Sequence, residues 1–207
     1  LNPNYAEAHS NLGNIFIDLG NLEEAEISTR KAIGLNPELA EAHNNLGKIM
    51  RESDQLKESE ISTRKAIKLK PDYADAYNNL GITLNELGNS EEAELSLYKA
   101  IKIKPDFVDA YSNLGGILGD QGRSKEAEKL LRKAIGLSPD YAEAYLNLSF
   151  LDLRKGNYLS GLEMYENRFN IKKPYPTYGK TKIKKKDNKE FRKGEKLLVV
   201  SEQGLGD

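Results

Sequence analysis

The sequence predicts an all-α fold, a solenoid built from one pair of helices repeated along the chain. Five prolines recur at intervals of 34 residues, at Pro3, Pro37, Pro71, Pro105 and Pro139. A near-copy of one pattern follows each proline, as in Tyr5-Ala-Glu-Ala-His and Tyr73-Ala-Asp-Ala-Tyr, and four of the five copies have a glycine 17 residues after the proline. Self-similarity at such a period is typical of helical arrays, in which each unit buries its apolar faces against its neighbours.

The first helix of each copy is expected to begin just after the proline. A proline at the first helical position loses no hydrogen bond, and an acidic first turn suits the helix dipole. The helix is expected to end where four copies have the glycine of a left-handed C-cap and the second copy has an aspartate. These ends are Gly20, Asp54, Gly88, Gly122 and Gly156.

The second helix of the first copy is expected from about Glu23 to Leu35. Its apolar side is expected to carry Ala25, Ile27, Ala32 and Ile33. Small residues recur where the two helices of a pair must come close. On the first helix they are Gly13, Gly47, Gly81, Gly115 and Ser149, and on the second they are Ala25, Ser59, Ala93, Ala127 and Gly161.

Residues 1–169 resemble the tetratricopeptide repeat family in these small pairs, in the closing proline and in a late alanine. The late alanines are Ala32, Ala66, Ala100 and Ala134. The resemblance implies a right-handed superhelix of antiparallel helix pairs, with a concave groove that is lined by first helices and binds a protein or peptide. We expect full repeats from about residues 6, 40, 74 and 108, and a capping repeat from about 142, in which Arg168 replaces the late alanine.

An asparagine just before a leucine recurs in every copy, at Asn11, Asn45, Asn79, Asn113 and Asn147. An amide side chain is both donor and acceptor, so it can pair with an extended backbone of any sequence. The segment is similar to the superhelical repeats of O-linked N-acetylglucosamine transferases, where such a ladder holds peptide backbone. We therefore expect peptide binding by this ladder. The alternative is that the asparagines only bridge neighbouring repeats.

Acidic residues accompany the ladder in two rows. The row near the helix starts, Glu7, Glu41, Asp75, Asp109 and Glu143, suits the helix dipole. The row near the helix ends, Asp18, Glu52, Glu86 and Asp120, suits a solvated face. The alternative for the two rows is a groove that prefers basic or neutral polar peptides. The family's clamp for an acidic C-terminal carboxylate needs lysine or arginine, whereas the matching positions here hold Ser10, Asn44, Asn78 and Ser112. That type of ligand is therefore not expected.

No catalytic residue is expected, because no carboxylate differs from its equivalents in the other repeats. His9 and His43 occupy positions where later copies have tyrosines, so they are interpreted as packed ring substitutes, with no metal and no cofactor. The chain has no cysteine, which excludes disulfides and thiolate metal sites and fits a reducing, cytoplasmic location. Its apolar runs are too short for a membrane span.

The charge of the chain changes sign after the repeats. Residues 1–169 carry a formal charge of −7, whereas residues 170–196 carry +8. Prolines and lysines without apolar periodicity predict a basic linker over residues 170–195. Nucleic-acid binding is not expected, because the acidic array would repel phosphates.

The last residues, 196–207, combine an apolar run with a Gly-x-Gly turn, which predicts a first strand and turn of an α/β domain. This end resembles bacterial proteins in which tetratricopeptide repeats precede a glycosyltransferase-like domain. The alternative function is therefore the acceptor-recruiting region of a glycosyltransferase whose catalytic domain is missing here. At the other end, Leu1-Asn2-Pro3 resembles the tail of an earlier repeat, so we expect exposed apolar surface and end-to-end self-association.

Overall fold

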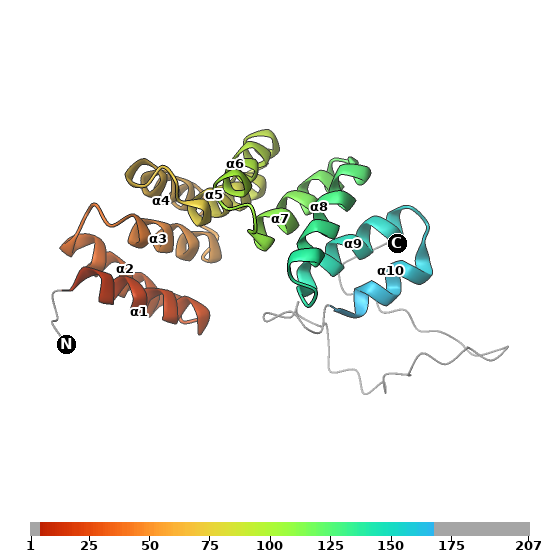
Figure 1. The fold of residues 1–207 in the computed structure, drawn as a ribbon. Helices are drawn as coiled ribbons and strands as arrows, with labels where there is room; N and C mark the ends of the chain where they lie inside the picture. The colour runs from red at the N-terminus through yellow and green to blue at the C-terminus, as the bar shows by residue number, and fades with distance from the viewer. Residues whose placement is uncertain (1–4, 168–207) are drawn as a thin grey trace, which may run out of the picture.

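The computed structural model describes residues 5–167, which form ten α-helices and no strand. The helices are α1 (Ala6–Asp18), α2 (Leu22–Leu35), α3 (Ala40–Glu52), α4 (Leu56–Leu69), α5 (Ala74–Glu86), α6 (Ser90–Ile103), α7 (Val108–Asp120), α8 (Ser124–Leu137), α9 (Ala142–Arg154) and α10 (Tyr158–Tyr165). Successive helices pair, and the pairs follow one another in chain order along an arc (Figure 1). The predicted all-α solenoid is confirmed.

The expectation that prolines occupy the first helical position was wrong for the four described ones, Pro37, Pro71, Pro105 and Pro139. Pro37 is the second residue of a four-residue turn, which is closed by a hydrogen bond from Leu39 N–H to Asn36 O (3.2 Å). Helix α3 begins only after this turn, at Ala40. The same bond closes the turns at Tyr73 and Tyr141. Proline is favoured at the second position of such a turn because its ring fixes φ near the value that the turn needs. The prolines therefore shape the link between repeats.

The predicted C-caps are confirmed. After α1, Gly20 has φ +78°, its N–H donates to Ile17 O (3.0 Å), and Asn21 N–H donates to Phe16 O (2.9 Å). These are the two hydrogen bonds of a Schellman motif, and the same pair of bonds follows α3, α5, α7 and α9. In the second repeat the left-handed position is held by Asp54, with φ +61°. The motif returns the chain into the second helix of each pair.

Asp54→Gly is expected to raise the unfolding free energy by about 0.5–1 kcal/mol, because a Cβ at positive φ strains the backbone. Urea unfolding measures the change. The matched control is Gly88→Ala, which introduces the same strain where a new Cβ would have no heavy atom within 4 Å. It is expected to lower the stability by a similar amount. A loss of stability in Asp54→Gly would show that the aspartate side chain itself contributes to the cap.

The helices of a pair approach closely through the small residues that the sequence indicated. A Cβ built on Gly81 of α5 would lie 3.2 Å from Ala93 O and 2.6 Å from Leu97 Cγ, both on α6. Equivalent Cβ atoms on Gly13, Gly47 and Gly115 would lie 3.3 Å from the backbone oxygen of the facing small residue. The absence of a side chain at these glycines therefore sets the distance between the two helices.

The predicted apolar side of α2 is correct except at one residue. Ala25 and Ala32 are fully buried and Ile33 is half-buried, whereas Ile27 is 62% exposed. At 3.6 residues per turn, Ile27 lies about 200° around the helix from Ala25, so the two residues face opposite sides. Its inclusion in the apolar side was wrong.

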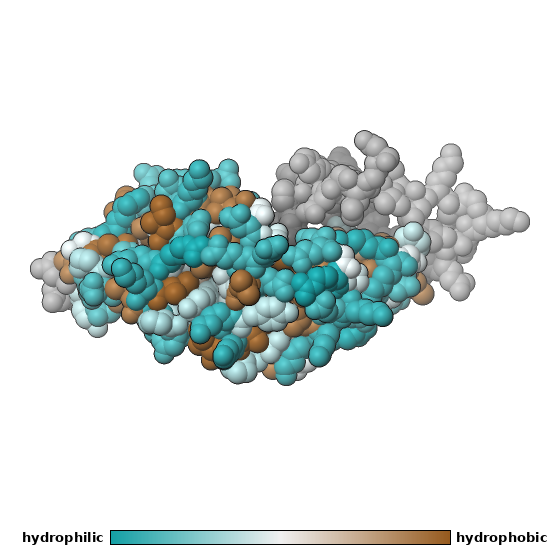
Figure 2. All heavy atoms as spheres, turned by 90° about the horizontal axis from the view of Figure 1, so that it is seen from above, coloured by the Kyte–Doolittle hydropathy of each residue, from teal (hydrophilic) through white to brown (hydrophobic). Residues whose placement is uncertain are grey.

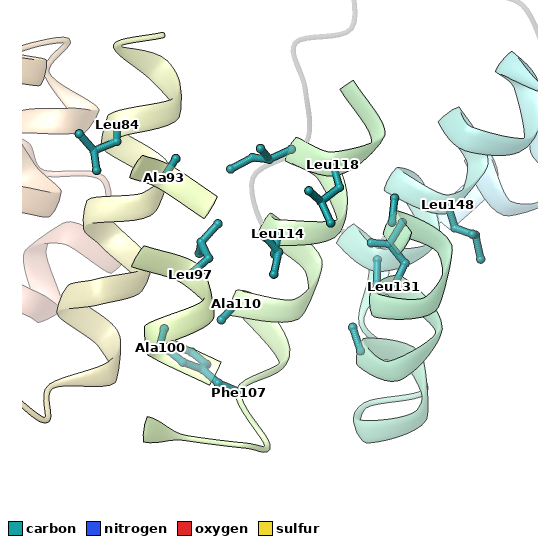
Figure 3. Close-up of a cluster of buried hydrophobic side chains, with 14 of the residues drawn as sticks. Leu84, Ala93, Leu97, Ala100, Phe107, Ala110, Leu114, Leu118, Leu131 and Leu148 are labelled. Carbon is teal, nitrogen blue, oxygen red and sulfur yellow. The ribbon is translucent and has the colours of Figure 1, made fainter. Parts of the chain in front are cut away.

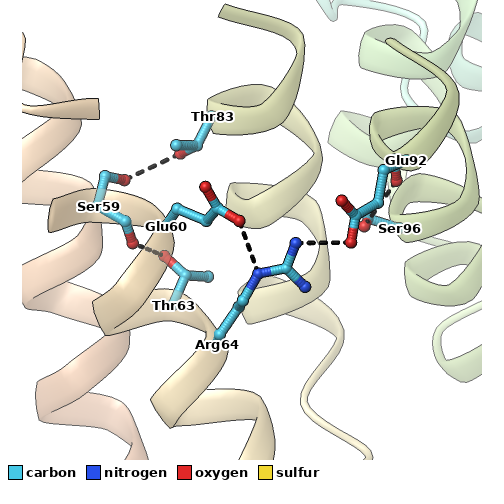
Figure 4. Close-up of polar contacts among 7 residues, drawn as sticks. All are labelled: Ser59, Glu60, Thr63, Arg64, Thr83, Glu92 and Ser96. Carbon is cyan, nitrogen blue, oxygen red and sulfur yellow. Dashed lines mark hydrogen bonds and ion pairs between the residues drawn. The ribbon is translucent and has the colours of Figure 1, made fainter. Parts of the chain in front are cut away.

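The hydrophobic core is not continuous along the array, because buried polar residues lie between two apolar clusters. A large cluster joins α5 to α9 and includes Leu84, Leu97, Leu114, Leu118 and Leu131 (Figure 3). A smaller cluster joins α1, α2 and α3 around Ile17, Ile49 and Met50. Between them, α4 and α5 bury the polar residues Ser59, Thr63 and Thr83 (Figure 4).

The array is curved because its two layers of helices pack differently. The first helices, α1, α3, α5, α7 and α9, each contact the next first helix directly. In the part of the chain that the structure describes, the outer helices α2, α4, α6 and α8 contact only the helices adjacent in sequence. First helices therefore lie closer together and form the concave side, and the outer helices are spread along the convex side.

Candidate functional site

A hollow of about 520 Å³ lies on the concave side, between α1, α3, α5 and the start of α7. Six asparagines line it: Asn11, Asn14, Asn44, Asn45, Asn78 and Asn79. The charged side chains in its lining are Glu41, Asp75 and Asp109 against Lys48. Three of the five predicted ladder asparagines are therefore brought together here, in a polar and acidic groove.

The ladder asparagines form a regular series of hydrogen bonds between repeats. Asn79 Nδ2 donates to Asn44 Oδ1 (2.9 Å), and Asn113 Nδ2 donates to Asn78 Oδ1 (2.9 Å). In the same way Asn45 Nδ2 donates to the backbone oxygen (3.1 Å) and the hydroxyl (3.2 Å) of Ser10. Asn147 bonds Ser112 in the same two ways. The bridging role that the sequence analysis left open is thus present.

Bridging leaves part of each amide unused. An asparagine offers two N–H groups and one carbonyl oxygen. Within residues 5–167, one N–H and the Oδ1 of the Asn79 side chain have no hydrogen-bonding partner. The Oδ1 of Asn45 has no partner there either. Asn11 is exposed and forms no hydrogen bond with another described residue. The ladder therefore retains donors and acceptors that face the hollow.

The three carboxylates of the hollow differ in their partners. Glu41 accepts a hydrogen bond from Lys70 Nζ (2.9 Å), which lowers the pKa of Glu41. Asp109 accepts one from the hydroxyl of Tyr141 (2.5 Å), and burial, together with this bond, raises the pKa of Tyr141. Asp75 has neither an ion pair nor a hydrogen bond among the residues that the structure describes. Asp75 is therefore the carboxylate of the hollow that is left for a ligand.

Aromatic residues form the less polar end of the hollow. Asn44 Nδ2 lies 3.4 Å from the hydroxyl of Tyr73, and Lys70 Nζ lies 4.8 Å from the centre of the Tyr73 ring. Burial raises the pKa of Tyr73 to about 12. Phe107 also lines the hollow and is buried, and Lys104 Nζ lies 4.6 Å from the centre of its ring.

The second acidic row lies outside this hollow. Asp18, Glu52, Glu86 and Asp120 are the last residues of their helices. Three of them face a cation of a neighbouring repeat, with Asp18–Lys48 at 3.6 Å, Glu86–Arg51 at 3.5 Å and Asp120–Arg154 at 3.2 Å. These contacts link successive first helices and offset acidic charge at helix C-termini. A role of this row in ligand binding stays a prediction.

The sequence analysis named the acidic row that lines the hollow, but it chose the row near the helix ends for the peptide-binding site. Glu41, Asp75 and Asp109 each precede a ladder asparagine by four residues, which is one turn of helix. Residues four apart share a helix face. This spacing could have identified the row from the sequence alone.

His43 takes the place of a tyrosine ring, as the sequence predicted for both histidines; for His9 this stays a prediction. The Nε2 of His43 lies 2.8 Å from Pro37 O, and the hydroxyl of Tyr111, the equivalent residue two repeats later, donates to Pro105 O (3.2 Å). Within the described part of the chain, no group of three or more histidines and carboxylates could hold a metal ion. None of the helices from α1 to α10 is long and apolar enough to cross a membrane.

Comparison with family models identifies the repeats. Models described as tetratricopeptide repeat match residues 6–39, 40–73, 63–94 and 108–141, which together make up more than half of the chain. The chain belongs to the tetratricopeptide repeat family. A comparison of the tetratricopeptide array with curated proteins found no match.

Solved structures resemble the tetratricopeptide array in fold. PilF of Pseudomonas aeruginosa is 25% identical, with a TM-score of 0.69 over 78% of this chain and 74% of that chain. TTC0263 of Thermus thermophilus is 22% identical, with a TM-score of 0.71 over 78% and 88%. YrrB, described as having an unusual peptide-binding site, is 24% identical, with a TM-score of 0.58 over 80% and 86%. None of these three is described as a glycosyltransferase.

Proposed function

We propose that the tetratricopeptide array binds an extended peptide or protein segment in its concave groove, held through the asparagine ladder. The observation that carries the proposal is the hollow on the concave side, where Asn11, Asn45 and Asn79 retain unused hydrogen-bonding groups. An extended peptide presents unpaired N–H and C=O groups along its length, so amides one repeat apart can pair with it whatever its side chains. The proposal assigns binding and no chemical reaction to residues 5–167.

The charge of the hollow favours basic or neutral polar ligands. Three carboxylates face one lysine in its lining, and Asp75 forms no ion pair within the described residues. A lysine or arginine of the peptide would pair with Asp75 and steer the approach of the ligand. The peptide-binding site named for YrrB supports this use of the fold, although the identity of 24% limits that support to architecture.

Selection of short random peptides against the full chain tests the proposal. The selected peptides are expected to contain lysine or arginine, and Asp75→Lys is expected to weaken their binding by about tenfold in calorimetry. Asp75 is exposed and has no hydrogen bond or ion pair among the described residues, but it lies in the first turn of α5, where an acidic side chain suits the helix dipole. Asp75→Lys should therefore lower the thermal stability slightly and leave the chain folded, which thermal unfolding checks. Binding that is indifferent to Asp75→Lys would remove the acidic groove from the proposal.

The ladder needs a control for its structural role. Asn79→Ala and Asn147→Ala each remove a bridge between repeats, and each is expected to lower the stability by about 1 kcal/mol. Only Asn79 lines the hollow. We therefore expect weaker peptide binding in Asn79→Ala and unchanged binding in Asn147→Ala. Equal effects of the two substitutions would assign the ladder to structure alone.

The glycosyltransferase alternative depends on residues 196–207, which lie outside the described residues. The predicted linker 170–195 and Arg168 of the capping repeat also lie outside them. No observation on residues 5–167 favours it, and it stays a prediction. The cytoplasmic location and end-to-end self-association also stay predictions, the second of which light scattering at high protein concentration would test.

A further inference from the structure

Two further hollows of about 440 Å³ each open on the convex side of the array. One lies between α2 and α4 above α3, and the other lies between α4 and α6 above α5. They exist because successive outer helices do not contact each other, which leaves the first helix between them as a floor. They are separate from the concave groove, with which they share no lining residue.

The two hollows are the same site, one repeat apart. Their equivalent apolar residues are Ile33 and Ile67, Leu46 and Leu80, and Ile61 and Leu95. Each also contains a ring at its floor, His43 in the first and Tyr77 in the second. A site that recurs with the repeat can hold two equivalent groups of a single ligand.

The outer edge of each hollow is an apolar side chain that the fold does not bury. Ile61 and Leu95 are each 69% exposed. The next repeat has an exposed lysine, Lys129, at the same position, so a helix pair of this array forms without an apolar residue there. Figure 2 shows hydrophobic side chains in small patches among hydrophilic ones on the face seen from above. Folding therefore gives no reason for the two exposed residues.

The rims of these hollows are basic. The first is lined by Arg30 and Lys65 and by no carboxylate, and Arg30 is paired at 2.8 Å with Glu26, which does not line the hollow. The second is lined by Arg64, Lys68 and Glu92, and Glu92 is paired with Arg64 at 2.6 Å (Figure 4). Lys65 and Lys68 form no ion pair with any described residue. The convex hollows thus attract negatively charged ligands, which the concave groove repels.

We propose that the convex side is a second docking surface, for an acidic amphipathic helix of a partner protein. The helix would place one apolar side chain in each hollow and carboxylates beside Lys65 and Lys68. Packed helix axes lie about 8–10 Å apart, and successive outer helices do not contact each other, so equivalent sites one repeat apart are farther apart than that. The apolar side chains of the docked helix would therefore lie two or three helical turns apart, roughly 11–16 Å. The apolar and basic groups together select this partner over a purely charged one.

The probe is a displayed library of helical peptides with two leucines placed two or three turns apart. The flanking positions are all acidic in one half of the library and all basic in the other half. We expect enrichment of the acidic half. Ile61→Lys with Leu95→Lys, which copies Lys129, should weaken the selected peptides by at least about tenfold. Lys65→Glu with Lys68→Glu should act in the same direction. Asp75→Lys, in the concave groove, should have no effect, which separates this surface from the proposed function.

Three outcomes would overturn the proposal. The first is no enrichment of acidic over basic helices. The second is binding that is unchanged by Ile61→Lys with Leu95→Lys while thermal unfolding shows that this variant is folded. The third is binding of the chain to anionic lipid vesicles that is abolished by the same substitutions, which would assign the surface to a membrane. Ile61→Ala with Leu95→Ala replaces the lysine variant if the latter does not fold, and it should also weaken binding.

Discussion

Replacing Ser59, Thr63 and Thr83 together by alanine, leucine and isoleucine is expected to raise the unfolding free energy by about 2–3 kcal/mol. Ser59 and Thr83 make the contact between α4 and α5 polar, Thr63 faces Gly47 of α3, and all three residues are buried. The next interface of the same kind, α6–α7, has Ala93, Leu97 and Ile117 at the equivalent positions. The substitutions copy an interface that the chain already forms and extend the apolar core toward the N-terminal repeats.

The single change Thr83→Ile is the informative control, because its effect is expected to have the opposite sign. Thr83 Oγ1 donates to Asn79 O (3.0 Å), so the contact of 2.9 Å between Thr83 Oγ1 and Ser59 Oγ has Ser59 as donor. Thr83→Ile leaves that buried hydroxyl without its acceptor, at a cost of about 1 kcal/mol or more. Urea unfolding measures both variants. If the triple variant is less stable than the natural chain, the polar interface contributes more than burial of apolar surface can replace.

Gly81→Val is expected to lower the unfolding free energy by roughly 2–3 kcal/mol, through overpacking. The new Cβ would lie 2.6 Å from Leu97 Cγ and 3.2 Å from the backbone oxygen of Ala93, so either Leu97 or the whole α6 must move. The matched control is Gly136→Ala in α8, where a Cβ would have no heavy atom within 4 Å. There the gain in helix propensity should raise the stability by up to about 1 kcal/mol. A tolerated Gly81→Val would show that the close approach of α5 and α6 is not required.

Much of the fold could be predicted because short sequence patterns that recur in every repeat determine where helices end and where they touch. The glycines at positive φ mark where first helices end, and the small residues mark where pairs touch. The misplaced residues, Pro37 and Ile27, show the limit of such signals. Proline suits both a first helical turn and a β-turn, and only the neighbouring backbone decides between them.

The candidate site was only partly predictable. The register of the repeat was sufficient to align the ladder asparagines, but not to show that Asn79 and Asn113 donate to the preceding repeat. That bond depends on the stacking of two repeats, which a single repeat does not encode. The convex hollows depend on curvature in the same way, because they open only where outer helices are spread apart.

The central claim is that the asparagine ladder of the concave groove holds an extended peptide. Its most direct test is nuclear magnetic resonance of the asparagine side-chain amides while a selected lysine-containing peptide is added to the chain labelled with nitrogen-15. We predict that the resonances of Asn45 and Asn79 shift and that those of Asn147 do not. Shifts confined to the outer helices α2, α4 and α6, with Asn45 and Asn79 unchanged at saturating peptide, would contradict it.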